Sequence, residues 1–121
     1  MAILLLLTTL SAAIVAFVGF LGLAGKLPPN HFAGIRTSFT LRSPENWYAT
    51  HQAGGPYVAL LSVAALAAGF AFVPFALAGK LSDVLVVVLV VAQAVLVGAG
   101  VLLSWLIGTS RAKAQLGNSA R

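Results

Sequence analysis

The sequence predicts an all-α integral membrane protein with three transmembrane helices and a short interfacial helix in the first connecting segment. Hydrophobic residues make up 60% of the 121 positions and charged residues only 7%, with a mean hydropathy of +1.04. A soluble domain is about 25% charged, so this chain has too little polar surface to cover itself in water. Its apolar residues form three long uncharged runs, and its polar residues gather between the first two runs.

Length and composition limit the classes of function to be considered. The 121 residues allow one membrane domain, residues 1–121, and no second one. The absence of cysteine excludes disulfides, thiolate catalysis and cysteine-based metal sites. The net charge of +5 is spread over the connections between apolar runs and not along one helix face. We expect it to set the topology and to attract anionic lipid headgroups. No nucleic-acid partner is predicted.

The first apolar run, residues 2–25, is predicted to cross the membrane as a helix. A helix of about 24 residues is roughly 36 Å long, enough to cross a hydrocarbon core of about 30 Å with some tilt. A secretory signal peptide is the alternative, but the run lacks a positively charged start and exceeds the roughly 7–15 residues of a signal core. Gly25 suits a helix C-cap, and Pro28 and Pro29 cannot continue the helix.

Two further spans are predicted after the polar segment, over residues 56–78 and 84–108. Pro56 fits the first turn of a helix. The polar link 79–83 is so short that the two helices must be antiparallel neighbours. The last run is rich in valine, yet in lipid a single run satisfies its backbone only as a helix. The tail, residues 109–121, is polar and basic.

Three spans place the segment 26–55 and the C-terminus on the same side of the membrane. The basic residues on that side are Lys26, Arg36, Arg42, Arg111, Lys113 and Arg121, whereas the other side has Lys80. Since cytoplasmic connections carry the excess of lysine and arginine, we expect this side in the cytoplasm and the N-terminus outside.

Small and polar residues in the third run predict which of its faces packs. Gly100, Ser104 and Gly108 recur at every fourth position, the spacing of a small-residue stripe that lets helices approach closely. Gln93 carries the only amide within a predicted span, so we expect it to face the bundle or a partner. We favour an interhelical hydrogen bond of about 1 kcal/mol over a ligand-binding role.

The segment 26–55 contains a predicted helix start. Ser43 is the N-cap, Pro44 takes the first helical position, and Glu45 lies in the first turn, where the macrodipole favours an acid. The helix runs over residues 44–53 and reaches a break or kink at the Gly-Gly-Pro of residues 54–56. One straight helix through both parts would exceed the thickness of a membrane. Residues 44–53 therefore form either a separate interfacial helix or a bent cytoplasmic extension of the second span.

Other residues of the segment fit a structural or a binding role. Trp47 and His51 are four positions apart and share one helix face, beside Tyr48. The aromatic residues either anchor the segment at the membrane interface or form a binding face. Arg36 offers a planar fork suited to carboxylate or phosphate, or it pairs with Glu45 and pins the loop.

No catalytic or metal-binding pattern is present in the sequence. His31 and His51 are too far apart for a local metal motif. Of the two acids, Glu45 and Asp83, the second is predicted on the opposite side of the membrane. The sequence also lacks paired acids, a glycine-rich phosphate loop and a nucleophile–base pattern. We therefore predict no enzymatic activity, no metal and no cofactor.

The segment also contains a spaced pattern of residues between positions 29 and 54. The pattern consists of Pro29, Asn30, Gly34, Ile35, Arg36, Thr37, Thr40, Leu41, Ser43, Glu45, Trp47, His51, Ala53 and Gly54. Together these residues resemble the signature of the SdpI family, small bacterial integral membrane proteins named for an immunity protein against a secreted toxic peptide. Larger members carry additional transmembrane helices, so this chain resembles a short, three-helix form.

The resemblance implies a multi-pass protein of the bacterial plasma membrane that binds a membrane-active peptide without catalysis, and confers immunity to it or senses it. The residues that it singles out as a site are Asn30, Gly34, Arg36, Thr37, Thr40, Glu45, Trp47 and His51. A secreted peptide arrives from outside, whereas this segment is predicted in the cytoplasm. We therefore expect the segment to be a conformational brace, a lipid contact or a docking site for an internal partner.

Two alternatives are open. One is an accessory or structural subunit of a larger membrane complex, or a self-oligomer, packed through the small-residue stripe of the third span. The other is a protein that binds anionic lipid headgroups through a cluster of Arg36, His31 and His51 at the membrane face. Membrane lipids are an expected partner in each case.

Overall fold

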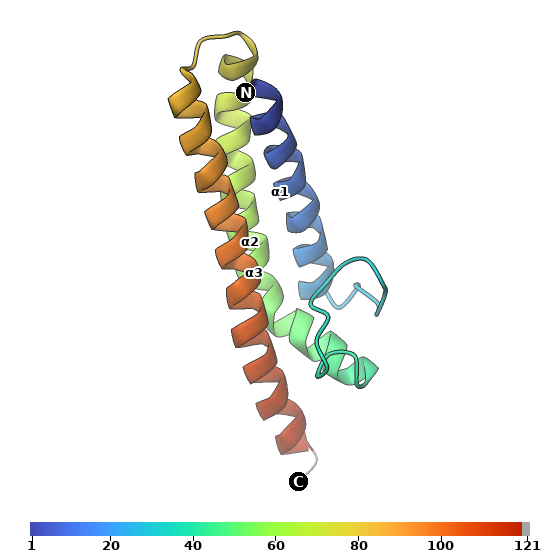
Figure 1. Cartoon of the computed structure of the whole chain (residues 1–121). Coiled ribbons are helices and arrows are strands. Elements are labelled where there is room, and N and C mark those ends of the chain that lie inside the picture. Colours follow the sequence, from blue (N-terminus) through green and yellow to red (C-terminus); the bar gives the residue numbers. More distant parts are fainter. Residues whose placement is uncertain (120–121) are drawn as a thin grey trace.

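The computed structural model describes residues 1–119, which form three helices and contain no strand (Figure 1). Helix α1 spans Ala2–Leu23, α2 spans Pro44–Leu77 and α3 spans Asp83–Ser119. All three are long and apolar enough to cross a membrane. The prediction of an all-α protein with three membrane-spanning helices is therefore confirmed in fold class and in the number of candidate spans.

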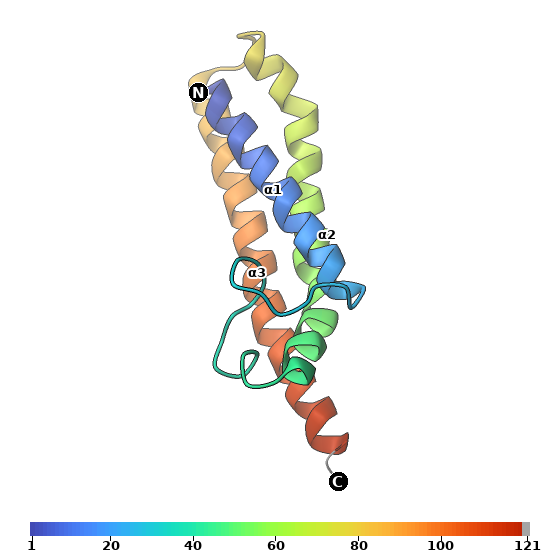
Figure 2. The same ribbon diagram turned by 90° about the vertical axis from the view of Figure 1, so that its right-hand side faces the viewer.

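The three helices form a bundle in which α2 packs along both of the others, whereas α1 and α3 contact each other much less. The N-terminus and the turn at 78–82 lie at one end of the bundle (Figures 1 and 2). The loop at 24–43 and the last turns of α3 lie at the other end. Helix α3 continues through the basic tail as far as Ser119, and Arg121 lies outside the described residues.

The first two helices end in the same way, at a glycine with positive φ. Gly25 has φ +71°, its amide donates to the carbonyl of Gly22 at 3.1 Å, and the next amide donates to the carbonyl of Leu21 at 2.8 Å. The same pair of bonds recurs around Gly79, where φ is +72°. This is the Schellman arrangement, which satisfies the last carbonyls of a helix and needs a left-handed residue.

The expected short interfacial helix does not form a separate element. Residues 44–53 are the first turns of α2, capped by the Ser43 hydroxyl, which accepts from the amide of Asn46 at 3.1 Å. Figure 1 shows these turns angled away from the rest of α2. Pro56 explains the bend, because it has no N–H for the carbonyl four residues earlier and its ring crowds that carbonyl. Of the two predicted forms, the bent extension of the second span is the one observed.

The two glycines before Pro56 serve close packing and do not end the helix. A Cβ at Gly54 would lie 2.3 Å from the carbonyl oxygen of Ser104, and a Cβ at Gly55 would lie 2.7 Å from the amide nitrogen of Leu23. Glycine here lets α2 approach α3 and α1 at once. The prediction of a separate helix was wrong because it read Gly-Gly as a helix breaker.

The small-residue stripe of α3 faces α2 within the same chain. A Cβ at Gly108 would lie 2.6 Å from the carbonyl oxygen of Thr50, and one at Gly100 would lie 3.1 Å from the Cα of Val58. Ser104 is buried between them and lies against Gly54. Such contacts are typical of membrane helices whose backbones approach closely. A protein partner or a second copy of the chain would have to use another surface.

One side chain of α3 connects all three helices by hydrogen bonds. Gln93 is only 2% exposed, and its amide nitrogen donates to the Thr9 hydroxyl and to the Ala65 carbonyl, both at 2.9 Å. Its amide oxygen accepts from the Thr8 hydroxyl at 2.5 Å. Because these groups would be unsatisfied in hydrocarbon, the bonds select one register of α1 and α2 relative to α3.

Two glycines of α3 provide a test of this packing. Gly108→Ala is expected to lower the free energy of unfolding by about 1–3 kcal/mol, because the new methyl group overlaps the backbone of α2. Gly98→Ala is the matched control, since a Cβ there meets nothing within 4 Å. It should be neutral or stabilising by up to about 1 kcal/mol through helix propensity. Thermal unfolding of both variants in one detergent measures the difference, and equal midpoints would contradict the packing.

Candidate functional site

The loop between α1 and α2, residues 24–43, is folded around its own polar side chains. The side-chain oxygen of Asn30 accepts from the amides of Phe32 at 2.8 Å and Ala33 at 2.7 Å, and its amide nitrogen donates to the carbonyl of Pro28 at 2.9 Å. The guanidinium of Arg36 donates to the carbonyl of Asn30. Asparagine in such a turn replaces a backbone partner. Arg36 therefore pins the loop through Asn30, and Glu45 lies exposed in the first turn of α2.

Two threonines close the second half of the loop. The hydroxyl of Thr40 accepts from the amide of Thr37 at 2.9 Å and donates to the carbonyl of Ile35 at 2.8 Å. The hydroxyl of Thr37 accepts in return from the amide of Thr40 at 3.2 Å. Thr40 is almost completely buried. The pair satisfies backbone groups that no helix or strand satisfies, which is the general requirement for a buried loop.

Trp47 and His51 dock the loop onto α2. Trp47 is fully buried, and its indole nitrogen donates to the carbonyl of Leu27 at 2.9 Å. The centroids of the Trp47 and His51 rings lie 4.3 Å apart. The tryptophan therefore contacts protein on all sides and does not face lipid or solvent. Its role here is to hold the first turns of the loop on the helix.

Both ring nitrogens of His51 are engaged. Nδ1 lies 2.7 Å from the carbonyl oxygen of Trp47, one turn earlier in α2, and Nε2 lies 2.8 Å from the amide nitrogen of Ile35. A carbonyl can only accept and an amide can only donate, so the partners assign a neutral imidazole with its proton on Nδ1. His51 is buried, whereas His31 and Arg36 are exposed on the loop. The structure therefore does not bring these three residues together as an exposed cluster.

Gly34 allows the loop to lie directly on the two rings. Its φ is +112°, and a Cβ there would lie 2.7 Å from His51 Nε2 and 3.0 Å from the Trp47 ring. No other residue type tolerates both the backbone angle and the contact. Seven of the eight site residues singled out from the signature thus form one structural unit, and Glu45 lies outside these contacts. The members that the hydrogen bonds and contacts join are Asn30, Gly34, Arg36, Thr37, Thr40, Trp47 and His51.

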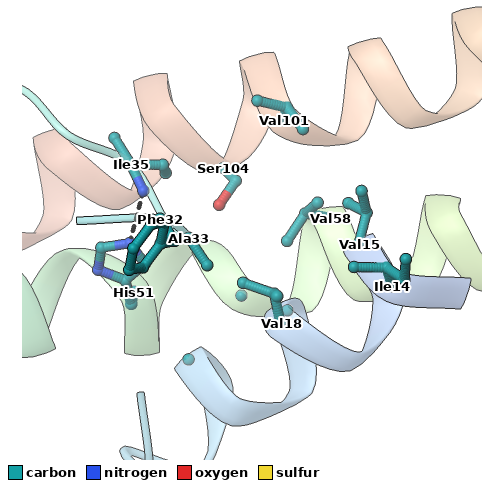
Figure 3. Close-up of a pocket in the computed structure, with 14 residues that line it drawn as sticks. Ile14, Val15, Val18, Phe32, Ala33, Ile35, His51, Val58, Val101 and Ser104 are labelled. Carbon is teal, nitrogen blue, oxygen red and sulfur yellow. Dashed lines mark hydrogen bonds between the residues drawn. The ribbon is translucent and has the colours of Figure 1, made fainter. Parts of the chain in front are cut away.

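A cavity of about 290 Å³ lies beside this unit, between α1 and α3 (Figure 3). Helix α2 lines it through Gly55 and Val58, and the loop closes one side through residues 32–35. Most of its large lining side chains are aliphatic: Ile14, Val15, Val18, Ile35, Val58 and Val101. The Ser104 hydroxyl points into it (Figure 3), and His51 lies at its edge. The arrangement suits an apolar group with few polar contacts.

The cavity lies between α1 and α3, the two helices that contact each other least. Two of its lining residues are strongly exposed, Ile14 on α1 and Phe32 on the loop, the latter 96% exposed. Sequence reasoning missed this cavity, because its walls are ordinary aliphatic residues within predicted spans. A cluster of glycines at Gly19, Gly22 and Gly55 is the one sequence feature that accompanies it.

No group of three or more histidine, cysteine, aspartate or glutamate side chains that could hold a metal ion occurs among residues 1–119. His51, the most buried titratable side chain of the loop region, already uses both nitrogens. What the site offers chemically is an apolar recess under a rigid loop.

A family model, described as the SdpI/YfhL protein family, matches residues 26–109, which is more than half of the chain. The matched region includes the loop, all of α2 and the apolar part of α3. Comparison with curated proteins and with solved structures gives no match.

The hydroxyl of Thr40 provides a test of how the loop is held. Thr40→Val keeps the shape but removes the acceptor of the Thr37 amide and the donor to the Ile35 carbonyl, a loss of about 1–3 kcal/mol when such groups are buried. Amide hydrogen exchange over residues 35–40 should become about tenfold faster or more. Thr40→Ser keeps the hydroxyl and should exchange at the native rate. Equal rates for Thr40→Val and the native chain would show that the bonds do not hold the loop.

Proposed function

Because the chain belongs to the SdpI/YfhL protein family, we propose that it is a membrane protein that binds a membrane-active peptide and protects its cell from that peptide or senses it. It does so by binding and has no catalysis of its own. The observation that carries the proposal is the cavity between α1 and α3. Much of it is lined by residues of the apolar runs, and one of them, Ile14, is 65% exposed on the outside of α1, where a ligand dissolved in the bilayer would reach it.

The size of the cavity limits what enters it. Sites for small molecules measure about 300–1,000 Å³, so about 290 Å³ holds one or two apolar side chains and not a whole helix. A membrane-active peptide would therefore lie against the outside of α1 and α3 and insert side chains into the cavity beneath the loop. Van der Waals packing supplies the attraction, since burial of apolar surface offers little driving force between helices in lipid.

The loop provides a way for the protein to signal that the cavity is occupied. Ala33 and Ile35 line the cavity, and the amide of Ile35 is the donor to His51. A side chain large enough to displace Ile35 breaks that bond and loosens the loop from α2. The signature residues then act as a brace for the cavity wall, which agrees with their internal hydrogen bonds.

The proposed orientation makes the cavity accessible from the inner half of the membrane. Lys80 lies at the end of the bundle that contains the N-terminus, and the loop and the last turns of α3 are at the other end (Figure 1). The basic residues described at that second end are Lys26, Arg36, Arg42, Arg111 and Lys113. By the positive-inside rule we assign this end to the cytoplasm of a bacterial cell and the N-terminus to the outside. A peptide would then be met after it has inserted into the bilayer, and not at the outer surface.

Substitutions at two neighbouring residues of α1 can distinguish a role of the cavity from a role of the lipid-facing surface. Val18→Trp fills the cavity, whereas Phe17→Trp changes a side chain that is 63% exposed and does not line it. We expect deletion of the gene to increase sensitivity to the cell's own secreted peptides, Phe17→Trp to restore resistance, and Val18→Trp to fail. Growth inhibition measures this, with protein levels in the membrane checked for each variant. If deletion leaves sensitivity unchanged, the proposal is overturned. Equal rescue by both variants would show that the cavity is not needed for protection.

A further inference from the structure

A second hollow, of about 510 Å³, lies between the loop and the C-terminal half of α3. It differs in chemistry from the cavity, because its walls carry four hydroxyl groups and one ammonium group. The residues that matter are Thr37 and Ser38 on the loop and Trp105, Thr109, Ser110 and Lys113 on α3.

The hollow lies where the protein passes from apolar to polar. The uncharged run of α3 ends at Gly108, so Trp105 is on the apolar side of the hollow, and Thr109 and Lys113 are on the polar side. Trp105 is 42% exposed. Tryptophan at such a boundary is typical of the level of the lipid headgroups. The site is therefore at the depth of a phosphate group and not at the depth of an acyl chain.

The ammonium of Lys113 has no oxygen partner among residues 1–119. It lies over the Phe39 ring, 5.3 Å from its centroid, which holds it beside the loop. Glu45 and Asp83 are the two acids of the chain, and Asp83 is thirty positions away along the same helix. Ser38 and Ser110, which also line the hollow, are exposed, so their hydroxyls are accessible to a ligand.

An apolar groove continues from this hollow towards the middle of the membrane. It measures about 320 Å³ and is lined by Gly98, Val101 and Leu102 together with Ile35 of the loop. Thr37 and Trp105 line both the groove and the hollow, so the two adjoin each other. A polar recess joined to an apolar groove fits a ligand with an anionic head and a hydrocarbon tail.

We propose that this hollow binds an anionic phospholipid. Its phosphate contacts the Lys113 ammonium and the exposed hydroxyls of Ser38 and Ser110, and one acyl chain lies along the groove over Leu102. A charge-assisted bond to phosphate combined with hydroxyl donors is the chemistry that recognises such headgroups. The net charge of +5 and the scarcity of acids favour an anionic over a zwitterionic lipid. The inference does not rest on the peptide-binding function, because the residues that contact the phosphate do not line the cavity between α1 and α3.

Native mass spectrometry of the full chain tests the site. The protein is taken from a detergent containing equal amounts of phosphatidylglycerol and phosphatidylcholine, and the retained lipid is counted. Lys113→Gln should lower phosphatidylglycerol retention about tenfold, the loss expected for one charge-assisted hydrogen bond. Lys113→Arg should retain it. Arg111→Gln is the matched control, since it removes the same charge two positions away, where Arg111 lies over Tyr57. It should stay within about twofold of native retention.

Ser110→Ala gives a second, independent measurement, because it removes an exposed hydroxyl from the wall of the hollow. It should lower retention several-fold, and it decides the matter if Lys113→Gln does not fold. Equal losses for Arg111→Gln and Lys113→Gln would show attraction to the overall charge and overturn the site. So would unchanged retention in Lys113→Gln. If inorganic phosphate alone stabilises the protein against heat as well as the lipid does, the site binds free anions and the lipid proposal is wrong.

Discussion

The hydrogen bond from the amide of Ile35 to Nε2 of His51 joins the two parts of this protein, the helical bundle and the loop. The cavity, the hollow and the groove are all lined in part by loop residues, so their shapes depend on the position in which that bond holds the loop. Ile35 closes the cavity between α1 and α3 and also lines the groove beside α3. The bond in turn needs the rotamer of His51 that its own Nδ1 fixes on the carbonyl of Trp47, and it needs a glycine at position 34. One imidazole therefore positions both candidate binding surfaces.

The sequence predicts the bundle well because the signals involved are long or local. Uncharged runs of more than twenty residues leave few options in lipid, and Ser43 before Pro44 identifies the start of α2. The inward direction of Gln93 follows from the cost of an amide in hydrocarbon. The continuity of α2 through Gly54 and Gly55 was harder to predict, because these glycines serve helix contacts that depend on the distant residues Ser104 and Leu23.

The candidate site was less predictable than the fold for a related reason. In the loop, Asn30, Thr37 and Thr40 bond mainly to backbone atoms, which have no sequence signal of their own. The cavity walls are valines and isoleucines that resemble any lipid-facing residue. A signature rich in polar residues suggested a ligand contact, yet most of its members are used inside the protein. The surfaces left for ligands combine a few signature residues, such as Ile35 and Thr37, with residues outside the signature, such as Val18 and Lys113.

The docking of the loop onto α2 depends on pH, because its bond to His51 requires the neutral imidazole. A protonated imidazole presents N–H groups on both sides, so it can no longer accept from Ile35 and would be a buried cation beside Gly22, Gly34 and Trp47. Acidification therefore acts against the docked loop, while the bonds of Gln93 involve no titratable group and persist.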